Sequence, residues 1–256
     1  MLYGIDVSSW QRGLEIKKLK DISFVIAKAT EGIGLTDKCC NAFIEQAKAL
    51  GLPWGFYHYA RNNSGKFDAD YFYNATKNYF GSGLPILDYE DPALLKSGKG
   101  VAYAEEFMQF IYNKTGIYPV LYTSAAILSS FKKSWIPQKC ALWLAGYPRT
   151  YTQFGNYNMP YKLEPWSKCI IWQFSGSGKL AGYEGQLDLD RAYIDVDEWN
   201  RLIKGVSKSQ HQDELLAACR VVLGEYGTGA MRKEKLQQEG YSYANVQDLV
   251  NKIVKL

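Results

Sequence analysis

The segment Leu84–Pro92 is an apolar run that ends in three carboxylates. On an extended strand, Asp88 and Glu90 point to the same side with about 6.6 Å between their Cα atoms, whereas Asp91 points away. Each carboxylate disfavours ionisation of the other, so at least one keeps its proton near neutral pH. This is the state that a general acid requires. A solvated loop or a calcium site is the alternative interpretation of this short pattern.

Two further acids are candidates for the same site. Asp6 ends an apolar strand within Gly4–Trp10, and Asp188 is expected to end the last strand, within Gln186–Asp190. Either acid alone is typical of a cap or a turn. Together with the Asp88/Glu90 pair, however, they place four acids at the ends of three separated strands. A barrel of βα units collects such strand ends on one face.

Aromatic and hydrogen-bonding side chains accompany these acids at the expected strand ends. Such groups stack on sugar rings and bind hydroxyls, although buried Tyr and Trp also serve as core residues with a polar tip. For His58, a polar cleft wall and a satisfied core residue are equally good interpretations. The candidates for the cleft are Lys28, Tyr57, His58, Tyr59, Tyr122, Trp143, Tyr147, Trp172 and Gln173.

Other chemistries are not supported by the sequence. Only two His are present, which excludes a site with several His ligands, so we expect no metal and no cofactor. The run Gly176–Lys179 lacks the residues of a phosphate loop. The five Cys include no CxxC pair and indicate reduced thiols. The net charge of +4 is scattered, which does not favour a nucleic-acid partner.

Alternating strands and helices are expected to position the candidate residues. Up to about Ile203, short apolar runs alternate with helix-like segments, which predicts βα units around a largely parallel sheet. We expect helices over 40–50, 101–115 and 125–131. The predicted strands are 2–7, 24–28, 54–59, 85–90, 120–123, 141–145 and 170–174.

The chain is expected to contain two domains. A catalytic domain over 1–205 is followed by a polar linker over 206–212 and a small helical module over 213–256. Ser242 is placed to cap the last helix. No run approaches the roughly 20 apolar residues of a membrane span, and the first residues do not have the pattern of a signal peptide. We therefore expect synthesis in a cytoplasm and action on a bacterial wall only after release.

The first 200 residues resemble family 25 glycoside hydrolases, which are lysozymes of phage lysins and bacterial autolysins. The resemblance implies an α/β fold, an irregular (β/α)5β3 TIM-like barrel, that cleaves the β-1,4 bond between N-acetylmuramic acid and N-acetylglucosamine. The matching motifs are the runs 6–11, 24–28, 30–32, 55–59, 87–90, 121–123, 142–145 and 172–174.

The family pattern also implies roles for the four acids. Glu90 matches the general acid, and Asp6, Asp88 and Asp188 match the acids around the reacting sugar. The family usually has Asn where this chain has Asp190, and we favour Asp188 as the acid that faces the cleft. A carboxylate nucleophile and attack by the substrate's own N-acetyl group both remain open.

The tail resembles the CW-seven cell-wall-binding repeat, which implies a three-helix module that binds peptidoglycan fragments. Arg232, Tyr241 and Gln247 are its expected contacts with a muropeptide. One copy would bind weakly unless the module dimerises. We therefore expect a phage endolysin with peptidoglycan as its partner. The alternatives are a bacterial autolysin, a wall-binding protein without activity and a different glycosidase such as a chitinase.

Overall fold

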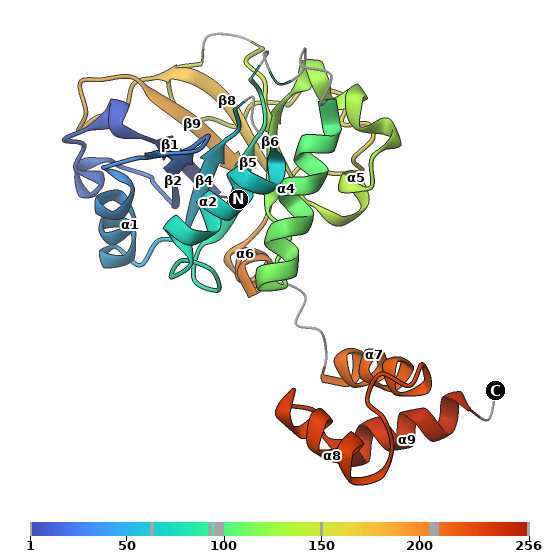
Figure 1. Cartoon of the computed structure of the whole chain (residues 1–256). Helices are drawn as coiled ribbons and strands as arrows, with labels where there is room; N and C mark the ends of the chain where they lie inside the picture. The colour runs from blue at the N-terminus through green and yellow to red at the C-terminus, as the bar shows by residue number, and fades with distance from the viewer. Residues whose placement is uncertain are drawn as a thin grey trace. The chain divides into compact units, whose positions relative to one another are not determined.

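The chain divides into two compact units, residues 1–205 and 206–256. The computed structural model describes residues 2–61, 64–91, 94, 100–148, 151–204 and 210–254. In Figure 1 the first unit runs from blue to orange and the second is orange to red. Part of the predicted linker, 206–209, lies outside the described residues. The last three residues of the predicted linker, 210–212, are helical, because α7 already begins at Gln210.

The first unit is built around a sheet that closes into an eight-stranded barrel. Seven of its strands pair in parallel, and β9 closes the ring by pairing antiparallel with both β8 and β1. The two-residue β3 (Leu35–Thr36) pairs with β2 outside the ring. This confirms the predicted α/β barrel class. The barrel strands are β1 (Leu2–Val7), β2 (Phe24–Glu31), β4 (Trp54–Tyr59), β5 (Leu84–Asp88), β6 (Val120–Ser124), β7 (Leu142–Ala145), β8 (Ile171–Gly178) and β9 (Leu187–Ala192).

Helices connect the strands and cover the outside of the barrel (Figure 1). The predicted helix over 125–131 forms, but as a 3-10 helix that extends to Lys133. Gly51 and Gly116 follow two of the helices with φ of 66° and 73°, a left-handed conformation that costs glycine little. The helices of this unit are α1 (Cys40–Ala49), α2 (Gly65–Thr76), α4 (Gly100–Thr115), α5 (Ile136–Lys139) and α6 (Val196–Lys204), with 3-10 turns at Ser9–Gln11, Ile16–Lys18 and Ala125–Lys133.

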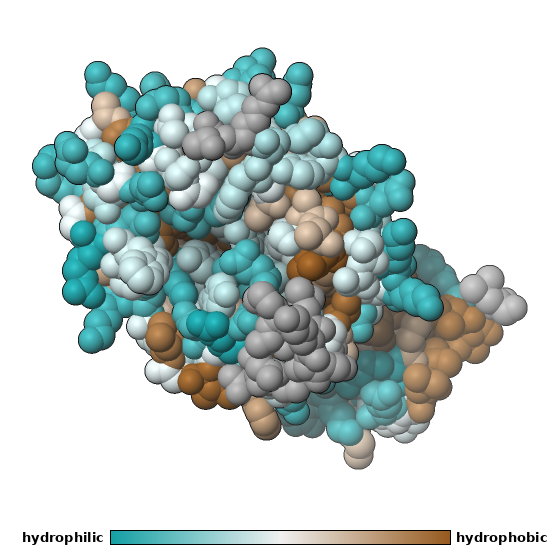
Figure 2. All heavy atoms as spheres, turned by 90° about the horizontal axis from the view of Figure 1, so that it is seen from above, coloured by the Kyte–Doolittle hydropathy of each residue, from teal (hydrophilic) through white to brown (hydrophobic). Residues whose placement is uncertain are grey.

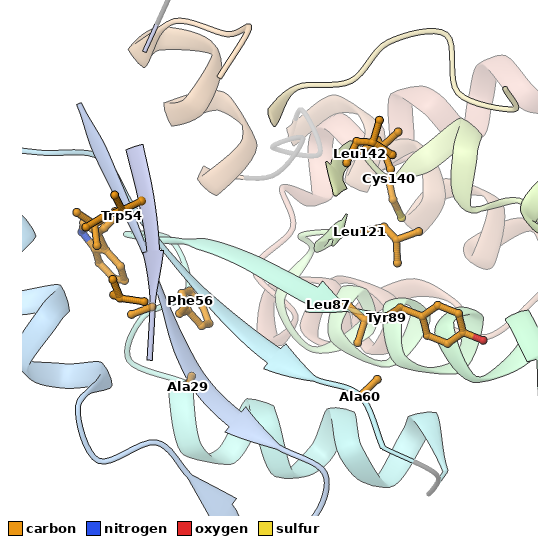
Figure 3. Close-up of a cluster of buried hydrophobic side chains, with 14 of the residues drawn as sticks. Ala29, Trp54, Phe56, Ala60, Leu87, Tyr89, Leu121, Cys140 and Leu142 are labelled. Carbon is orange, nitrogen blue, oxygen red and sulfur yellow. The ribbon is translucent and has the colours of Figure 1, made fainter. Parts of the chain in front are cut away.

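The strands separate the core into an inner and an outer layer, because successive side chains point to opposite faces. The outer layer lies between the strands and the helices and includes Phe56, Leu87 and Leu121 from three neighbouring strands (Figure 3). The inner layer fills the barrel. At the end where the strands begin, Trp199 of α6 packs on Phe24 with ring centroids 5.2 Å apart. The helix α6 therefore closes this end.

The second unit consists of α7 (Gln210–Val222), α8 (Gly229–Gln238) and α9 (Tyr243–Ile253). Its small core includes Ala218, Tyr226, Leu236 and Val246. Ser242 caps α9 as predicted, since its Oγ accepts a hydrogen bond from the backbone N–H of Asn245. None of the helices that the structure describes is long and apolar enough to cross a membrane.

Candidate active site

The Asp88/Glu90 pair lies at the carboxyl end of β5. The strand ends at Asp88, which is buried, and Glu90 follows two residues later on the same inner side. The carboxyl of Glu90 lies near the hydroxyl of Tyr122 on the neighbouring strand β6, and this hydroxyl lowers the pKa of Glu90. The alternation that the sequence predicts for 88 and 90 therefore continues beyond the last paired residue of the strand.

Asp6 and Asp188 face each other across the β1/β9 pair. The register pairs Asp6 with Asp188 and Gly4 with Asp190. The prediction that Asp188 ends a strand is wrong, because it is the second residue of β9. Since β9 runs antiparallel to its neighbours, its beginning lies beside their carboxyl ends, and Asp188 still reaches the predicted face.

A pocket of about 290 Å³ opens among these strand ends. Figure 2 views the molecule from above and shows a hollow in the surface that is bordered largely by hydrophilic side chains. The indole of Trp10 is 87% exposed at the pocket, as an open aromatic face. The pocket lining consists of Asp6, Val7, Ser8, Trp10, Gln11, Lys28, Tyr57, Gly176, Gln186 and Asp188.

All four predicted acids have raised pKa values. Burial raises the pKa of Glu90 above 4.5; the charge of Asp91 raises it further, whereas the nearby Tyr122 hydroxyl and the charge of Lys28 oppose the rise. Burial and then Glu90 raise the pKa of Asp188 to about 6. Asp6 and Asp88 are raised well above 3.8, again by burial first and by neighbouring carboxylates second. Mutual repulsion in a poorly solvated site thus favours carboxyls that keep protons.

Two tyrosines and a glutamine fix the orientation of Asp6. The hydroxyl of Tyr122 donates to Oε1 of Gln173 at 2.7 Å, and the hydroxyl of Tyr147 donates to the same oxygen. With Oε1 occupied by these donors, Nε2 of Gln173 turns to Oδ2 of Asp6 at 2.6 Å. Three of the predicted cleft residues therefore form one network that ends on a carboxylate.

A charged group borders the cleft beside Tyr59. A β-bulge between Lys28 and Thr30 inserts one residue into β2, so Lys28 and Glu31 turn to the same side and form an ion pair. Burial by itself would raise the pKa of Glu31, but Lys28 and Arg61 lower it. The Nζ of Lys28 lies 4.8 Å and the Cζ of Arg61 4.7 Å from the centroid of the Tyr59 ring.

Arg61 joins this group to the loop after β5, although the sequence analysis did not single it out. Its guanidinium binds Glu31 through Nε and Nη2 and reaches Oδ2 of Asp91 from Nη1 at 3.0 Å. Asp91 directly follows Glu90, so Arg61 anchors the loop that carries the expected general acid. Nothing in the local sequence marks these contacts, because Glu31 and Arg61 are 30 residues apart.

Two predicted cleft residues, His58 and Trp172, belong to the outer layer instead. His58 is fully buried against Phe107, with its ring nitrogens bonded to Thr30 and Asp68. Burial lowers its pKa despite the bond to Asp68, which favours a neutral ring. Trp172 is also fully buried. Both residues sit one position away from inner residues on their strands, and the period of two excludes them from the cleft.

Trp143 lies inside the barrel but below the cleft surface. It is buried in the inner layer and packs its ring 4.5 Å from that of Tyr122. Its Nε1 donates to Oδ1 of Asp190 at 2.9 Å. Trp143 therefore supports the acids from beneath and does not offer a stacking surface.

Residues after β1 contribute a cleft edge that the sequence analysis did not assign. Ser8 and Gln11 form a capping box, with the backbone N–H of Ser8 donating to Oε1 of Gln11 at 3.0 Å. This turn places Trp10 and Gln11 at the pocket, where Nε2 of Gln11 donates a hydrogen bond to the carbonyl of Gln186 on the segment before β9 at 3.4 Å. The Ser-x-x-Gln spacing after an apolar strand is the signal from which this edge was predictable.

Two of the three predicted wall-contact residues of the second unit, Arg232 and Gln247, contact each other. Nη1 of Arg232 donates to Oε1 of Gln247 at 3.1 Å, and its Nε donates to the carbonyl of Gly227 at 3.0 Å. Tyr241 packs partly buried against the core of this unit. Across the described parts of both units, no group of three or more His, Cys, Asp or Glu side chains could hold a metal ion.

The closed barrel with carboxylates gathered at one end has the architecture of a glycoside hydrolase. The model of glycosyl hydrolases family 25 matches residues 5–183, and that of the CW_7 repeat matches residues 215–254. The first match covers most of the chain, and the chain therefore belongs to glycosyl hydrolase family 25.

Lysozymes that resemble this chain in structure or in sequence are consistent with membership of this family. The bacterial lysozyme of Streptomyces coelicolor superposes with a TM-score of 0.68 and 26% identity, over 79% of this chain and 97% of that one. The lysozyme of Streptococcus phage Cp-7 is 25% identical over 97% of this chain and 69% of its own length. The autolytic lysozyme of Clostridium acetobutylicum is 28% identical over 73% of this chain, which spans about half (54%) of that protein.

Proposed function

We propose that this chain is a muramidase that cleaves the β-1,4 bond between N-acetylmuramic acid and N-acetylglucosamine in peptidoglycan. The observation that carries the proposal is the gathering of Asp6, Asp88, Glu90 and Asp188 at one end of the barrel, where Asp6 and Asp188 line the pocket and burial and neighbouring carboxylates raise the pKa of all four acids. Hydrolysis of a glycosidic bond uses two such carboxyls, one of them protonated.

Glu90 is the general acid in this proposal. Glu90 is more exposed to solvent than Asp88, and its raised pKa keeps a proton available for the glycosidic oxygen. After the leaving group departs, the resulting carboxylate accepts a proton from water. The hydrogen bond from Arg61 to Asp91, the next residue along the chain, helps to hold the loop that carries Glu90 in place during both steps.

Asp88 is suited to bind the substrate rather than to donate a proton. Its Oδ1 is buried and has no hydrogen-bond partner among the described residues. An acceptor of this kind fits the N–H of a sugar's acetamido group, which it would orient towards the anomeric carbon. Asp6 and Asp188 both line the pocket, where they stabilise positive charge that develops on the sugar ring.

Mass spectrometry of fragments from purified peptidoglycan tests this assignment. The wild-type chain is expected to release fragments with muramic acid at the new reducing ends, and Glu90→Gln is expected to release almost none. Glu106→Gln, on the outer helix α4, is the matched control and should leave the products unchanged. Reducing-end glucosamine would indicate a different glycosidase, and intact glycan with the wild type would indicate a wall-binding protein without activity.

We further propose that the second unit binds muropeptides and that the whole chain acts on the wall as a phage endolysin. The CW_7 match supports wall binding, and the phage Cp-7 lysozyme is similar over both units. Arg232 and Gln247 hold each other in a geometry that presents polar atoms from α8 and α9 together. A dimer formed through this module would raise the effective affinity.

Sedimentation of the full chain with purified walls tests the role of the second unit. Glu90→Gln is the background, so that the walls are not digested. Adding Arg232→Met should reduce the bound fraction, whereas Lys233→Met, which removes an equal charge from the same helix, should not. Equal retention of both variants would exclude Arg232 as a wall contact.

A further inference from the structure

Asp190 is a buried acid beneath the cleft for which the proposed reaction has no role. It lies two residues beyond Asp188 on β9, on the same inner side, and is 0% exposed. Its Oδ1 accepts the hydrogen bond from Nε1 of Trp143. Its Oδ2 is buried and receives no donor from any described residue. A buried carboxylate oxygen without a donor is costly, so this oxygen requires an explanation.

Asp6 lies close enough to explain it. Gly4 pairs with Asp190 across the β1/β9 ladder, which puts Asp6 on the adjacent inner position of β1. A hydrogen bond between the two carboxyls at this position lowers the pKa of Asp6 and raises the pKa of Asp190. Ionised carboxylates only accept hydrogen bonds, so a bond between two carboxyls needs a proton on one of them. Asp6 already accepts from Gln173, which favours the negative charge on Asp6.

We propose that Asp190 holds a resident proton and donates it in a hydrogen bond to Asp6, so that Asp190 acts as a neutral positioning residue for the cleft carboxylates. Asp6 then receives two donors, from Gln173 and from Asp190, and its carboxylate is fixed in the plane that they define. Trp143 on the opposite oxygen keeps Asp190 from rotating.

The charges around Asp190 agree with a protonated state. Burial, Asp6 and Asp188 together raise the pKa of Asp190 well above 3.8. Arg191 does not compensate, since its guanidinium binds Tyr157 and Asn156 on the outer side of β9. The titratable and charged groups that face this end of the barrel are Asp6 on β1, Lys28 and Glu31 on β2, Tyr57 and Tyr59 on β4, Asp88 and Glu90 at β5, Tyr122 on β6, Tyr147 after β7 and Asp188 on β9.

Infrared difference spectroscopy of the full chain tests the proton directly, without reference to activity. The wild type minus Asp190→Asn spectrum at neutral pH is expected to show the C=O stretch of a protonated carboxyl, with a downshift in D2O. Trp143→Phe should move this band, because it removes the hydrogen bond to Oδ1. A difference spectrum without a protonated-carboxyl band would overturn the proposal.

Hydrolysis tests the positioning role, and this part rests on the proposed function. Asp190→Leu removes the donor to Asp6 and should lower kcat roughly tenfold to a hundredfold, the effect of losing a hydrogen bond to a charged group. Asp190→Asn offers a neutral N–H in place of the acid O–H and should restore the rate and the pH profile. Failure of Asn to restore them would refute the positioning role, whereas an inactive wild type with the infrared band would refute only the muramidase assignment.

Discussion

Replacing Asp188 by Asn should stabilise the barrel at neutral pH and remove most of the activity. Folding raises the pKa of Asp188 from 3.8 to about 6, mainly by burial and then through Glu90. The folded state therefore binds this proton more tightly than the unfolded state does. The stability that this provides is complete below pH 3.8 and is lost as the pH rises to about 6.

The loss amounts to at most about 3 kcal/mol, since each pKa unit corresponds to about 1.36 kcal/mol. Asn cannot ionise and avoids the loss. We expect Asp188→Asn to match the wild type near pH 4 and to exceed it by up to about 3 kcal/mol above pH 6. The proposed role of Asp188 predicts that its removal lowers kcat roughly a hundredfold or more.

Urea denaturation followed by tryptophan fluorescence measures this difference. All seven Trp residues lie between positions 10 and 199, so the signal reports on the barrel unit alone. Asp70→Asn, at an exposed position on α2, is the control for the loss of one negative charge. A stability difference that stays constant from pH 4 to 7 would refute the linkage argument. Full activity in Asp188→Asn would show that this acid is not part of the reaction.

Three other predictions test the placement of particular side chains. His58→Ala should lower the free energy of unfolding of the barrel by about 3 kcal/mol, because it leaves a cavity and removes a hydrogen-bond partner of buried Asp68, whereas kcat should stay nearly unchanged. A large loss of kcat without a loss of stability would instead indicate that His58 lies in the cleft. Gly65→Ala should cost about 2 kcal/mol in the same urea assay, since its Cβ would lie 2.0 Å from the carbonyl oxygen of Tyr103. Tyr122→Phe removes the nearby hydroxyl that lowers the pKa of Glu90, so the alkaline limb of kcat/KM should move to higher pH; a move to lower pH would contradict this arrangement.

The positions of the parallel strands were predictable because their apolar runs are short and end in turn residues. The predicted strands 2–7 and 54–59 match β1 and β4 at both ends. Whether each side chain faces the inside or the outside of the barrel was harder to predict, since parallel strands are buried on both faces and lack a polar face. For this reason Trp172 was included among the cleft candidates, and His58 was left between a cleft wall and a core residue. Counting by two from Tyr57 and Gln173 would have placed them outside.

Contacts between distant segments could not be predicted from local patterns. The direction of β9 depends on its pairing with β1 and β8, so the sequence around Asp188 alone does not indicate whether this acid begins or ends a strand. The bulge in β2 that turns Glu31 towards Arg61 has no local signature either. Such features follow from how the barrel closes, and closure involves residues from both ends of the unit.

The proposed chemistry depends on a fold that tolerates buried like charges. Five carboxyls, including Asp190, meet at one end of the barrel with raised pKa values, and each of them destabilises the folded state at neutral pH. The outer aromatic layer, in which Phe56, Phe72 and Phe107 pack together, contributes the burial that offsets this cost. Because the acids face inward, whereas Phe56 of β4 faces outward against Phe72 of α2 and Phe107 of α4, the cleft is free to differ in charge without loss of the barrel. Stability and catalysis are therefore expected to respond in opposite directions when a cleft acid is neutralised.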